Sequence, residues 1–233
     1  MRKRELKNVE WGILIIAVIL TIIGLVALFS ATQNTEYDEF KKQIIWLAIS
    51  LIAMVIVMLI NYETLVKLSP IFYGIFIILL IAVMFTKPVN GATSWFDIGF
   101  FSFQPSEFAK IAVILFLTYV ISKIQERYAE DINKPTRLLI IFVTLAIPLL
   151  LIIKQPDFGT AMAFCIALAM MLFTAGIDKK YIIGTILIAT ISIPLLYNFV
   201  LPDHAKKRID IFLNPESDPR GSGYNIIQSK LAI

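Results

Sequence analysis

The chain has 233 residues, of which 58% are hydrophobic and 16% are charged, and its formal net charge is +4. A typical water-soluble domain is only about half apolar. The apolar residues here lie in long runs, and no segment between the runs is long enough to bury a core of its own. The sequence therefore predicts an all-α, polytopic membrane protein and argues against a water-soluble enzyme.

Seven apolar runs follow one another along the chain, several of them near the lower length limit for a membrane-spanning helix. Charged residues are largely absent from every face of these runs, whereas the surface helices of a water-soluble protein have one polar face. The predicted spans cover residues 11–31, 43–61, 68–86, 106–122, 138–153, 160–176 and 181–201.

The positions of Lys and Arg predict the orientation of these spans. With a cytoplasmic N-terminus, the inner segments, beginning with MRKRELK, hold most of these residues, and the short outer loops hold few. An odd number of spans then places everything after about residue 202 outside the cell. The basic charge flanks apolar runs, so it favours an anionic membrane surface over nucleic acid. The single cysteine, Cys165, excludes an intramolecular disulfide.

The stretch SFQPSEFAKIAV begins the fourth run. Pro105 suits the first turn of a helix, where its missing N–H costs nothing. Glu107 and Lys110 follow at a spacing of three residues, so they share one helix face and can pair. Charges inside a membrane usually mark function or a cavity. An ion pair that only fixes the depth of the helix is the alternative.

A second polar stretch, KQPDFGTAMAF, precedes the sixth run. It again predicts a proline just inside a helix start, with Asp157 in the first turn. A carboxylate there complements the positive end of the helix. The simplest interpretation of Asp157 is therefore structural.

The third polar segment follows the seventh run and is predicted to form a large outer loop over residues 202–228. In it, Asp218 lies among the turn-forming residues of NPESDPRGSGYN. A carboxylate near cations can act as a general base while the cations hold a phosphate, although ordinary loop chemistry explains the same residues. Metal-ligand, nucleophile-elbow and nucleotide-binding motifs are absent from the sequence. The cations of this segment are Lys206, Lys207, Arg208 and Arg220.

Three stretches together resemble the SEDS family of shape, elongation, division and sporulation proteins, which includes RodA, FtsW and SpoVE. They are NGATSWFDIGFFSFQPSEFAK, KQPDFGTA and KKRIDIFLNPESDPRGSGYNIIQSKLAI. The ending GYNIIQSKLAI is nearer to the RodA pattern than to the FtsW pattern. The resemblance implies a fold of ten transmembrane helices, of which the last ones would lie beyond Ile233. It also implies a glycosyltransferase that polymerises lipid II at the outer face of the cytoplasmic membrane, for cell elongation.

The resemblance also assigns roles to residues of this chain. It matches the essential aspartate of the family to Asp218, and it matches the glycines of the same motif to Gly221 and Gly223. Glu107 and Lys110 correspond to the charged residues of the QPSE-xx-K motif. The implied partners are a class B penicillin-binding protein, which cross-links the product, and other membrane proteins of the elongation complex.

The sequence departs from the family pattern at two positions. Ser94 and Ser102 stand where many relatives have Arg. The loss of two outer-face cations leaves open how a donor pyrophosphate is held, with Lys87 or the run Lys206–Arg208 as substitutes.

The mechanism that we expect uses Asp218 as the base that takes a proton from the sugar hydroxyl of the acceptor. A cation of the basic run, or a Mg²⁺ or Mn²⁺ ion, would stabilise the departing pyrophosphate. Direct displacement would invert the anomeric centre. Two alternatives stay open: a transporter that flips a lipid-linked precursor, and a non-catalytic scaffold for a penicillin-binding protein. A transporter would carry midplane charges reachable from both sides.

Overall fold

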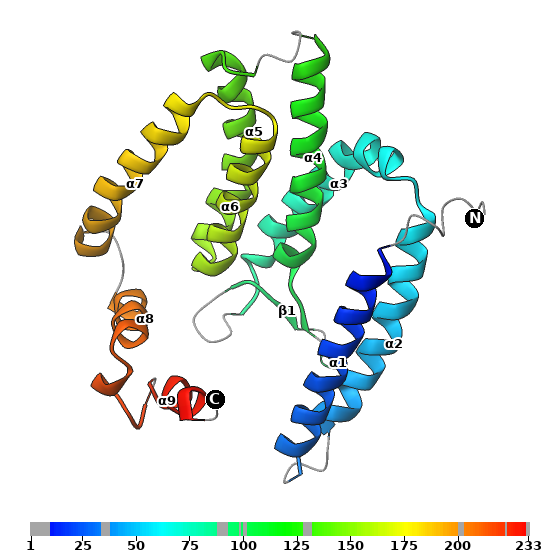
Figure 1. Ribbon diagram of the computed structural model, residues 1–233, viewed down its shortest axis with the longest axis vertical. Coiled ribbons are helices and arrows are strands. Elements are labelled where there is room, and N and C mark those ends of the chain that lie inside the picture. Colours follow the sequence, from blue (N-terminus) through cyan, green and yellow to red (C-terminus); the bar gives the residue numbers. More distant parts are fainter. Residues whose placement is uncertain are drawn as a thin grey trace. The chain divides into compact units, whose positions relative to one another are not determined.

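The computed structural model describes residues 10–33, 38–87, 93–97, 99, 102–127, 132–199, 203–221 and 223–231. These residues are almost entirely helical (Figure 1). The chain divides into two compact units. The first unit comprises Met1–Lys123 and Ile141–Cys165, and the second comprises Ile124–Ile140 and Ile166–Ile233.

The long helices form where the sequence predicts apolar spans. Most begin earlier than predicted, because polar residues such as Asp38 and Glu39 occupy the first turn of α2 and are tolerated there. The helices are α1 (Trp11–Ala31), α2 (Asp38–Leu59), α3 (Tyr62–Val83), α4 (Pro105–Arg127), α5 (Pro135–Lys154), α6 (Phe158–Thr174) and α7 (Lys179–Phe199).

Five helices of the described residues, α1, α2, α3, α5 and α7, are long and apolar enough to cross a membrane. The apolar helix α6 is shorter, at 17 residues. The helix α4, which the sequence also predicts as a span, carries charged residues in its first and last turns. Helices satisfy their backbone hydrogen bonds internally, as a lipid environment requires. The chain is a multi-pass, all-α membrane protein.

The surfaces of α1 and α2 are apolar and open. Neither helix has a buried residue among those described, and large side chains such as Ile13 and Val26 are exposed. The two helices contact each other, with the rings of Phe29 and Phe40 packed edge to face. Exposed apolar surface of this extent is expected on helices that face lipid tails.

The core of the first unit is built from α3, α4 and α5. Leu80, Val113 and Ile152 are fully or almost fully buried there. The hydroxyl of Tyr73 donates a hydrogen bond of 2.8 Å to the carbonyl of Thr144, which joins α3 to α5. Pro105 and Ser106, in the first turn of α4, are also fully buried.

A short hairpin precedes α4 and was not predicted from the sequence. Its strands, β1 (Phe96–Asp97) and β2 (Ser102–Phe103), pair antiparallel with Phe96 opposite Phe103. The ring of Phe103 lies 5.2 Å from that of Phe108 in α4. The hairpin is therefore anchored to the first turns of α4.

In the second unit, Asn133 holds the connection between α6 and α7 by accepting two hydrogen bonds. Its side-chain oxygen accepts the N–H of Asp178 at 2.7 Å, and its carbonyl accepts the hydroxyl of Tyr181 at 2.8 Å. These bonds fix the start of α7.

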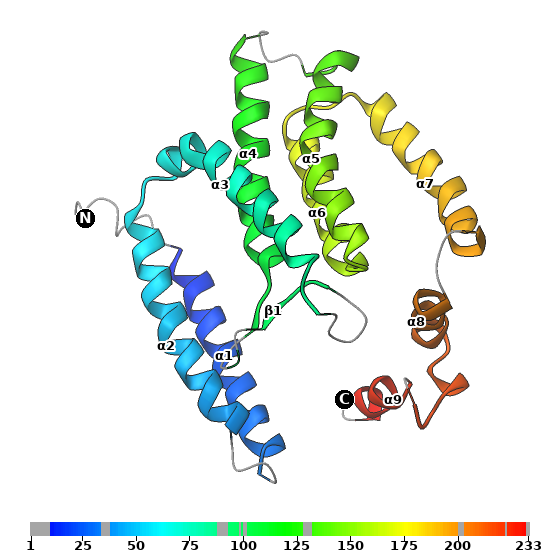
Figure 2. The same ribbon diagram turned by 180° about the vertical axis from the view of Figure 1, so that it is seen from behind.

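Residues 202–228, expected to be a loop, contain regular structure after α7. The elements are α8 (Asp203–Leu213), a 3₁₀ turn, η2 (Pro215–Ser217), and α9 (Tyr224–Leu231), which extends beyond the expected loop (Figure 2). The helix α8 has a polar and an apolar face, a pattern that hydropathy averaged over a membrane span does not detect.

Candidate functional site

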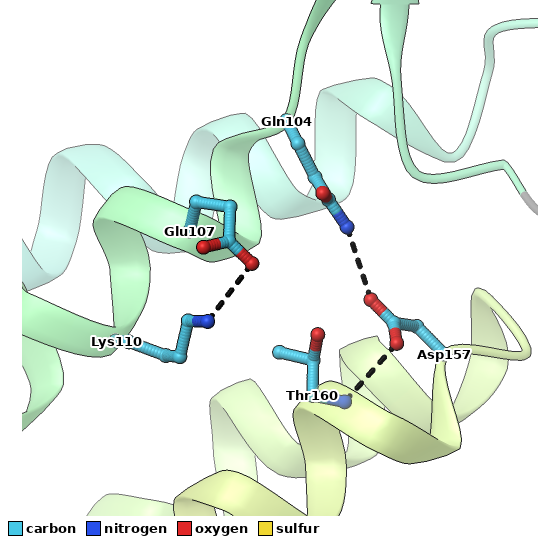
Figure 3. Close-up of polar contacts among 5 residues, drawn as sticks. All are labelled: Gln104, Glu107, Lys110, Asp157 and Thr160. Atoms are coloured by element: carbon cyan, nitrogen blue, oxygen red, sulfur yellow. Dashed lines mark hydrogen bonds and ion pairs between the residues drawn. The ribbon is translucent and has the colours of Figure 1, made fainter. Parts of the chain in front are cut away.

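The helix α4 begins at Pro105, as the sequence predicts. The ammonium group of Lys110 donates a hydrogen bond of 2.8 Å to Oε1 of Glu107, one turn earlier (Figure 3). The side chain of Lys110 is 31% exposed and that of Glu107 is 52% exposed. The predicted ion pair is confirmed, and it lowers the cost of keeping either charge beside apolar helices.

Asp157 lies just before α6 rather than in its first turn, so the prediction of its position is wrong. The helix begins at Phe158, and Pro156 also lies outside it. Oδ1 of Asp157 accepts the backbone N–H of Thr160 at 3.1 Å. An aspartate that binds the N–H three residues later caps a helix, which explains why it precedes the first helical residue.

The same aspartate joins the two QP stretches. The amide Nε2 of Gln104 donates a hydrogen bond of 3.1 Å to Oδ2 of Asp157, across 53 residues of sequence. Figure 3 shows both oxygens of Asp157 in use, one toward Gln104 and the other toward Thr160. The two stretches carry no sequence signal that pairs them, so this contact could not be predicted.

A buried polar group lies next to this contact in the sequence. Gln155 is fully buried, and its Nε2 donates a hydrogen bond of 2.9 Å to the carbonyl of Leu80. Within the described residues, its Oε1 and the hydroxyl of Ser106 are buried without a hydrogen-bond partner. Buried polar atoms without partners are rare in native proteins.

Ser94 and Ser102, which stand where many members of the SEDS family have Arg, differ in their environment. Ser94 is 2% exposed, and its hydroxyl donates to the carbonyl of Gln155 at 3.4 Å. Ser102 is exposed on β2. Lys87, the first expected substitute for the missing charges, is exposed after the end of α3.

Asp218 follows η2 and is held beside a cation of α8. Its side chain is 33% exposed, and Oδ2 lies 3.4 Å from Nζ of Lys207. The helix α8 packs against η2, where Ile211 and Pro215 are buried. The carboxylate and the ammonium group are therefore positioned by one small packed unit.

Two glycines surround Asp218. The N–H groups of Gly221 and Gly223 point to the carbonyl of Asp218, at 3.3 and 3.1 Å. A Cβ atom on Gly221 would lie 2.5 Å from both carboxylate oxygens of Asp218, and one on Gly223 would lie 2.2 Å from the carbonyl oxygen of Pro215. The close atoms at Gly223 belong to the backbone, so that position requires glycine, whereas a Cβ at Gly221 would require the side chain of Asp218 to move.

The remaining cations of the predicted cluster differ in their surroundings. Nζ of Lys206 donates to the carbonyl of Asn198, in the last turn of α7, at 3.2 Å. Arg208 and Arg220 are exposed. The sequence predicts a cluster of cations near Asp218, and the structure shows Lys207 in contact with this aspartate.

For the alternative of a Mg²⁺ or Mn²⁺ ion, the described residues offer no group of three or more His, Cys, Asp or Glu side chains that could hold a metal. Among the described residues, one positive charge beside Asp218 is the ammonium group of Lys207.

Comparison with known proteins identifies the family. Residues 10–233 match the family described as cell cycle protein, FtsW/RodA/SpoVE. The chain is 34% identical over 223 residues to the peptidoglycan glycosyltransferase MrdB of Escherichia coli, a match that covers 94% of this chain and 58% of MrdB. It is 33% identical over 241 residues to the probable peptidoglycan glycosyltransferase FtsW of Geobacter metallireducens, covering 99% of this chain and 63% of that protein.

Solved structures share the fold. A chain of a peptidoglycan synthase complex that coordinates polymerization and crosslinking matches with a TM-score of 0.79 and 24% identity, over 97% of this chain and 65% of that one. The rod shape determining protein RodA of Thermus thermophilus matches with a TM-score of 0.67 and 22% identity, over 79% of this chain and 60% of that one. The chain thus spans about three fifths of the length of these proteins. It belongs to the FtsW/RodA/SpoVE family.

Proposed function

We propose that the protein containing this chain is an inverting peptidoglycan glycosyltransferase that polymerises lipid II at the outer face of the cytoplasmic membrane. The observation that carries the proposal is the geometry at Asp218. Its carboxylate is partly exposed, lies beside Lys207 and is packed against Gly221. The names of the related proteins MrdB and FtsW support the same reaction.

The proposed reaction joins two lipid-linked sugars. Asp218 takes the proton from the attacking hydroxyl of the acceptor as this oxygen bonds to the anomeric carbon of the donor. The bond from that carbon to the polyprenyl pyrophosphate breaks, and its electron pair leaves with the pyrophosphate. Attack from the face opposite the leaving group inverts the anomeric centre.

Lys207 is suited to offset the negative charge in this reaction. Its ammonium group is 62% exposed, so it can contact a diphosphate as well as Asp218. A cation placed where charge develops stabilises the transition state more than the ground state. Lys206, Arg208 and Arg220 would add to the positive field that attracts an anionic lipid.

The paired residues of α4 would have a different role. The Glu107–Lys110 pair is partly exposed at the start of a helix with mostly apolar surroundings. We assign it to shaping and polarising the cavity for the substrate rather than to proton transfer. Asp157 and Gln104 hold the start of α6 to the residue before α4.

The proposed orientation has a cytoplasmic N-terminus and places the residues after about 202, Asp218 included, outside the cell. The proposed partner is a class B penicillin-binding protein that cross-links the glycan product, since the matched synthase complex couples polymerization to crosslinking. Elongation is the proposed process, with other membrane proteins of the elongation complex as further partners. Its support is the RodA-like ending GYNIIQSKLAI.

The test measures polymerisation and flipping with the same purified protein. Glycan chains are followed with purified lipid II in detergent, where no sealed bilayer exists, and flipping is followed with fluorescent lipid II in sealed vesicles. The proposal predicts glycan chains in detergent that depend on Asp218. Rapid flipping without polymerisation would instead identify the transporter, and neither activity would favour the scaffold.

A further inference from the structure

We propose that α8 lies in the membrane interface, with its apolar face in the acyl chains of an anionic leaflet and its opposite face toward Asp218. The identification of this leaflet as the outer one rests on the proposed function. The insertion of α8 itself rests on the geometry of the helix and its attachment to α7.

The first observation is an exposed apolar face on a short helix. Ile209, Phe212 and Leu213 follow the helical spacing of three and four residues, which puts them on one side of α8. Phe212 is 73% exposed and Leu213 is 76% exposed. Large apolar side chains on an amphipathic helix are typical of helices that lie flat in a lipid surface.

The second observation is that the opposite face is already occupied. Lys207 lies about 200° around the helix from Ile209, since each residue turns the helix by about 100°. Lys207 contacts Asp218, and Ile211 is buried where α8 packs on η2. The packing of η2 thus leaves the apolar face open.

The third observation is the attachment of α8 to a membrane-spanning helix. Only residues 200–202 separate the end of α7 from Asp203, so the link reaches at most about 14 Å. Lys206 donates to the carbonyl of Asn198, and the hydroxyl of Tyr197 donates to Asp210. Both α7 residues lie in its last turn, at the end of the span.

The direction of α8 agrees with a position along the surface. In Figures 1 and 2, α8 is seen nearly end-on, whereas α7 is seen along its length. Both helices belong to the second unit. If α7 crosses the bilayer, α8 therefore runs across that direction, along the membrane plane.

The charges of α8 select the lipid. Lys206, Lys207 and Arg208 form one continuous basic run, and Arg208 is exposed. Basic residues on an interfacial helix are attracted to anionic headgroups. The proximity to the end of a span and the basic charge favour a lipid leaflet over a protein as the partner of this face.

Insertion of α8 would hold the carboxylate of Asp218 at a fixed height relative to the membrane surface. With the apolar face in the acyl chains, Lys207 and Asp218 lie on the water side of α8, at the level of the headgroups. A lipid-linked pyrophosphate lies at this same level. The inserted helix therefore holds the proposed base where the reacting groups of such a substrate are.

Spin labels test the insertion without any need for turnover. The intact protein with Cys165→Ser receives a label at Phe212→Cys, or at Leu213→Cys as an independent position, and is reconstituted in vesicles of phosphatidylethanolamine and phosphatidylglycerol. The control label, at Glu216→Cys, is on η2, where the native side chain is exposed. Collisions with oxygen report lipid, and collisions with a water-soluble nickel chelate report water.

We expect the labels at 212 and 213 to collide mainly with oxygen and the label at 216 mainly with the nickel chelate. Replacing phosphatidylglycerol by phosphatidylcholine should shift the labels at 212 and 213 toward water. Labels at 212 and 213 that are accessible to the chelate in anionic vesicles, or shielded from both reagents by protein, would overturn the proposal. If the labels at 212 and 213 lie in water and the protein polymerises lipid II at the native rate, this inference is wrong and the proposed function stands. If these labels lie in lipid and the protein is inactive, the proposed function is wrong and this inference stands.

Discussion

Nζ of Lys207 lies 3.4 Å from Oδ2 of Asp218, and this contact links the exposed basic run of α8 to the turn after η2. The proposed base, Asp218, and the cation, Lys207, are thus held together by the packing of α8 on η2.

Replacing Lys207 by Gln should slow glycan polymerisation without abolishing it. Removing a buried donor that stabilises developing charge costs roughly 100-fold or more in kcat. Lys207 is 62% exposed, so water and neighbouring cations replace part of its effect, and we expect a loss of about tenfold. Initial rates with purified lipid II measure it. Lys230→Gln, a change on the exposed end of α9, is the matched control and should keep the native rate.

Replacing Gly221 by Ala should displace the carboxylate of Asp218. The new Cβ would lie 2.5 Å from both oxygens, so the side chain must move. A shift of about 1 Å in a reacting group can cost roughly 100-fold in rate. The control is Gly184→Ala in α7, where a Cβ meets nothing within 4 Å. Equal rates for the two variants would show that the position of Asp218 does not matter.

Replacing Lys110 by Gln should reduce polymerisation, because Glu107 then carries an uncompensated charge at the start of α4. The effect on thermal stability should be small, since partly exposed ion pairs contribute at most about 1 kcal/mol. Rates and melting temperatures are compared with those of the exchanged pair, Glu107→Lys with Lys110→Glu. If Lys110→Gln leaves the rate unchanged, the pair serves only to set the depth of the helix.

The sequence predicted the features that depend on local composition. Apolar runs indicated the long helices, and Pro105 marked the start of α4, because both signals act over one or a few helical turns. Glu107 and Lys110 could be paired from their spacing alone. The hairpin before α4 was missed, since strands of two residues leave almost no periodic pattern.

Contacts between residues far apart in the sequence could not be predicted from local composition. Gln104 and Asp157 are 53 residues apart, and nothing in either stretch specifies the other. The hydroxyl of Ser94 likewise donates to the carbonyl of Gln155, which lies beyond two intervening helices in the sequence. The helix α8 had a detectable signal, the spacing of Ile209, Phe212 and Leu213, but its basic residues made it look like a loop.

Replacing Asp157 by Ala should destabilise the protein by about 1–2 kcal/mol, because the cap of α6 is lost. Asp157→Asn should retain most of the stability, since an amide oxygen can still accept the N–H of Thr160. Melting temperatures in detergent test this. Thr160→Ser is the control, because the backbone N–H that donates the bond is unchanged. A melting temperature unaffected by Asp157→Ala would contradict the capping role.

The most direct measurement of the central claim compares two carboxylates of the same turn. Asp218→Asn keeps the size of the side chain but removes the base, and Glu216→Gln neutralises an exposed carboxylate two residues earlier. With purified lipid II and equal amounts of folded protein, we predict native glycan synthesis for Glu216→Gln and none for Asp218→Asn. Native synthesis by Asp218→Asn would contradict the account.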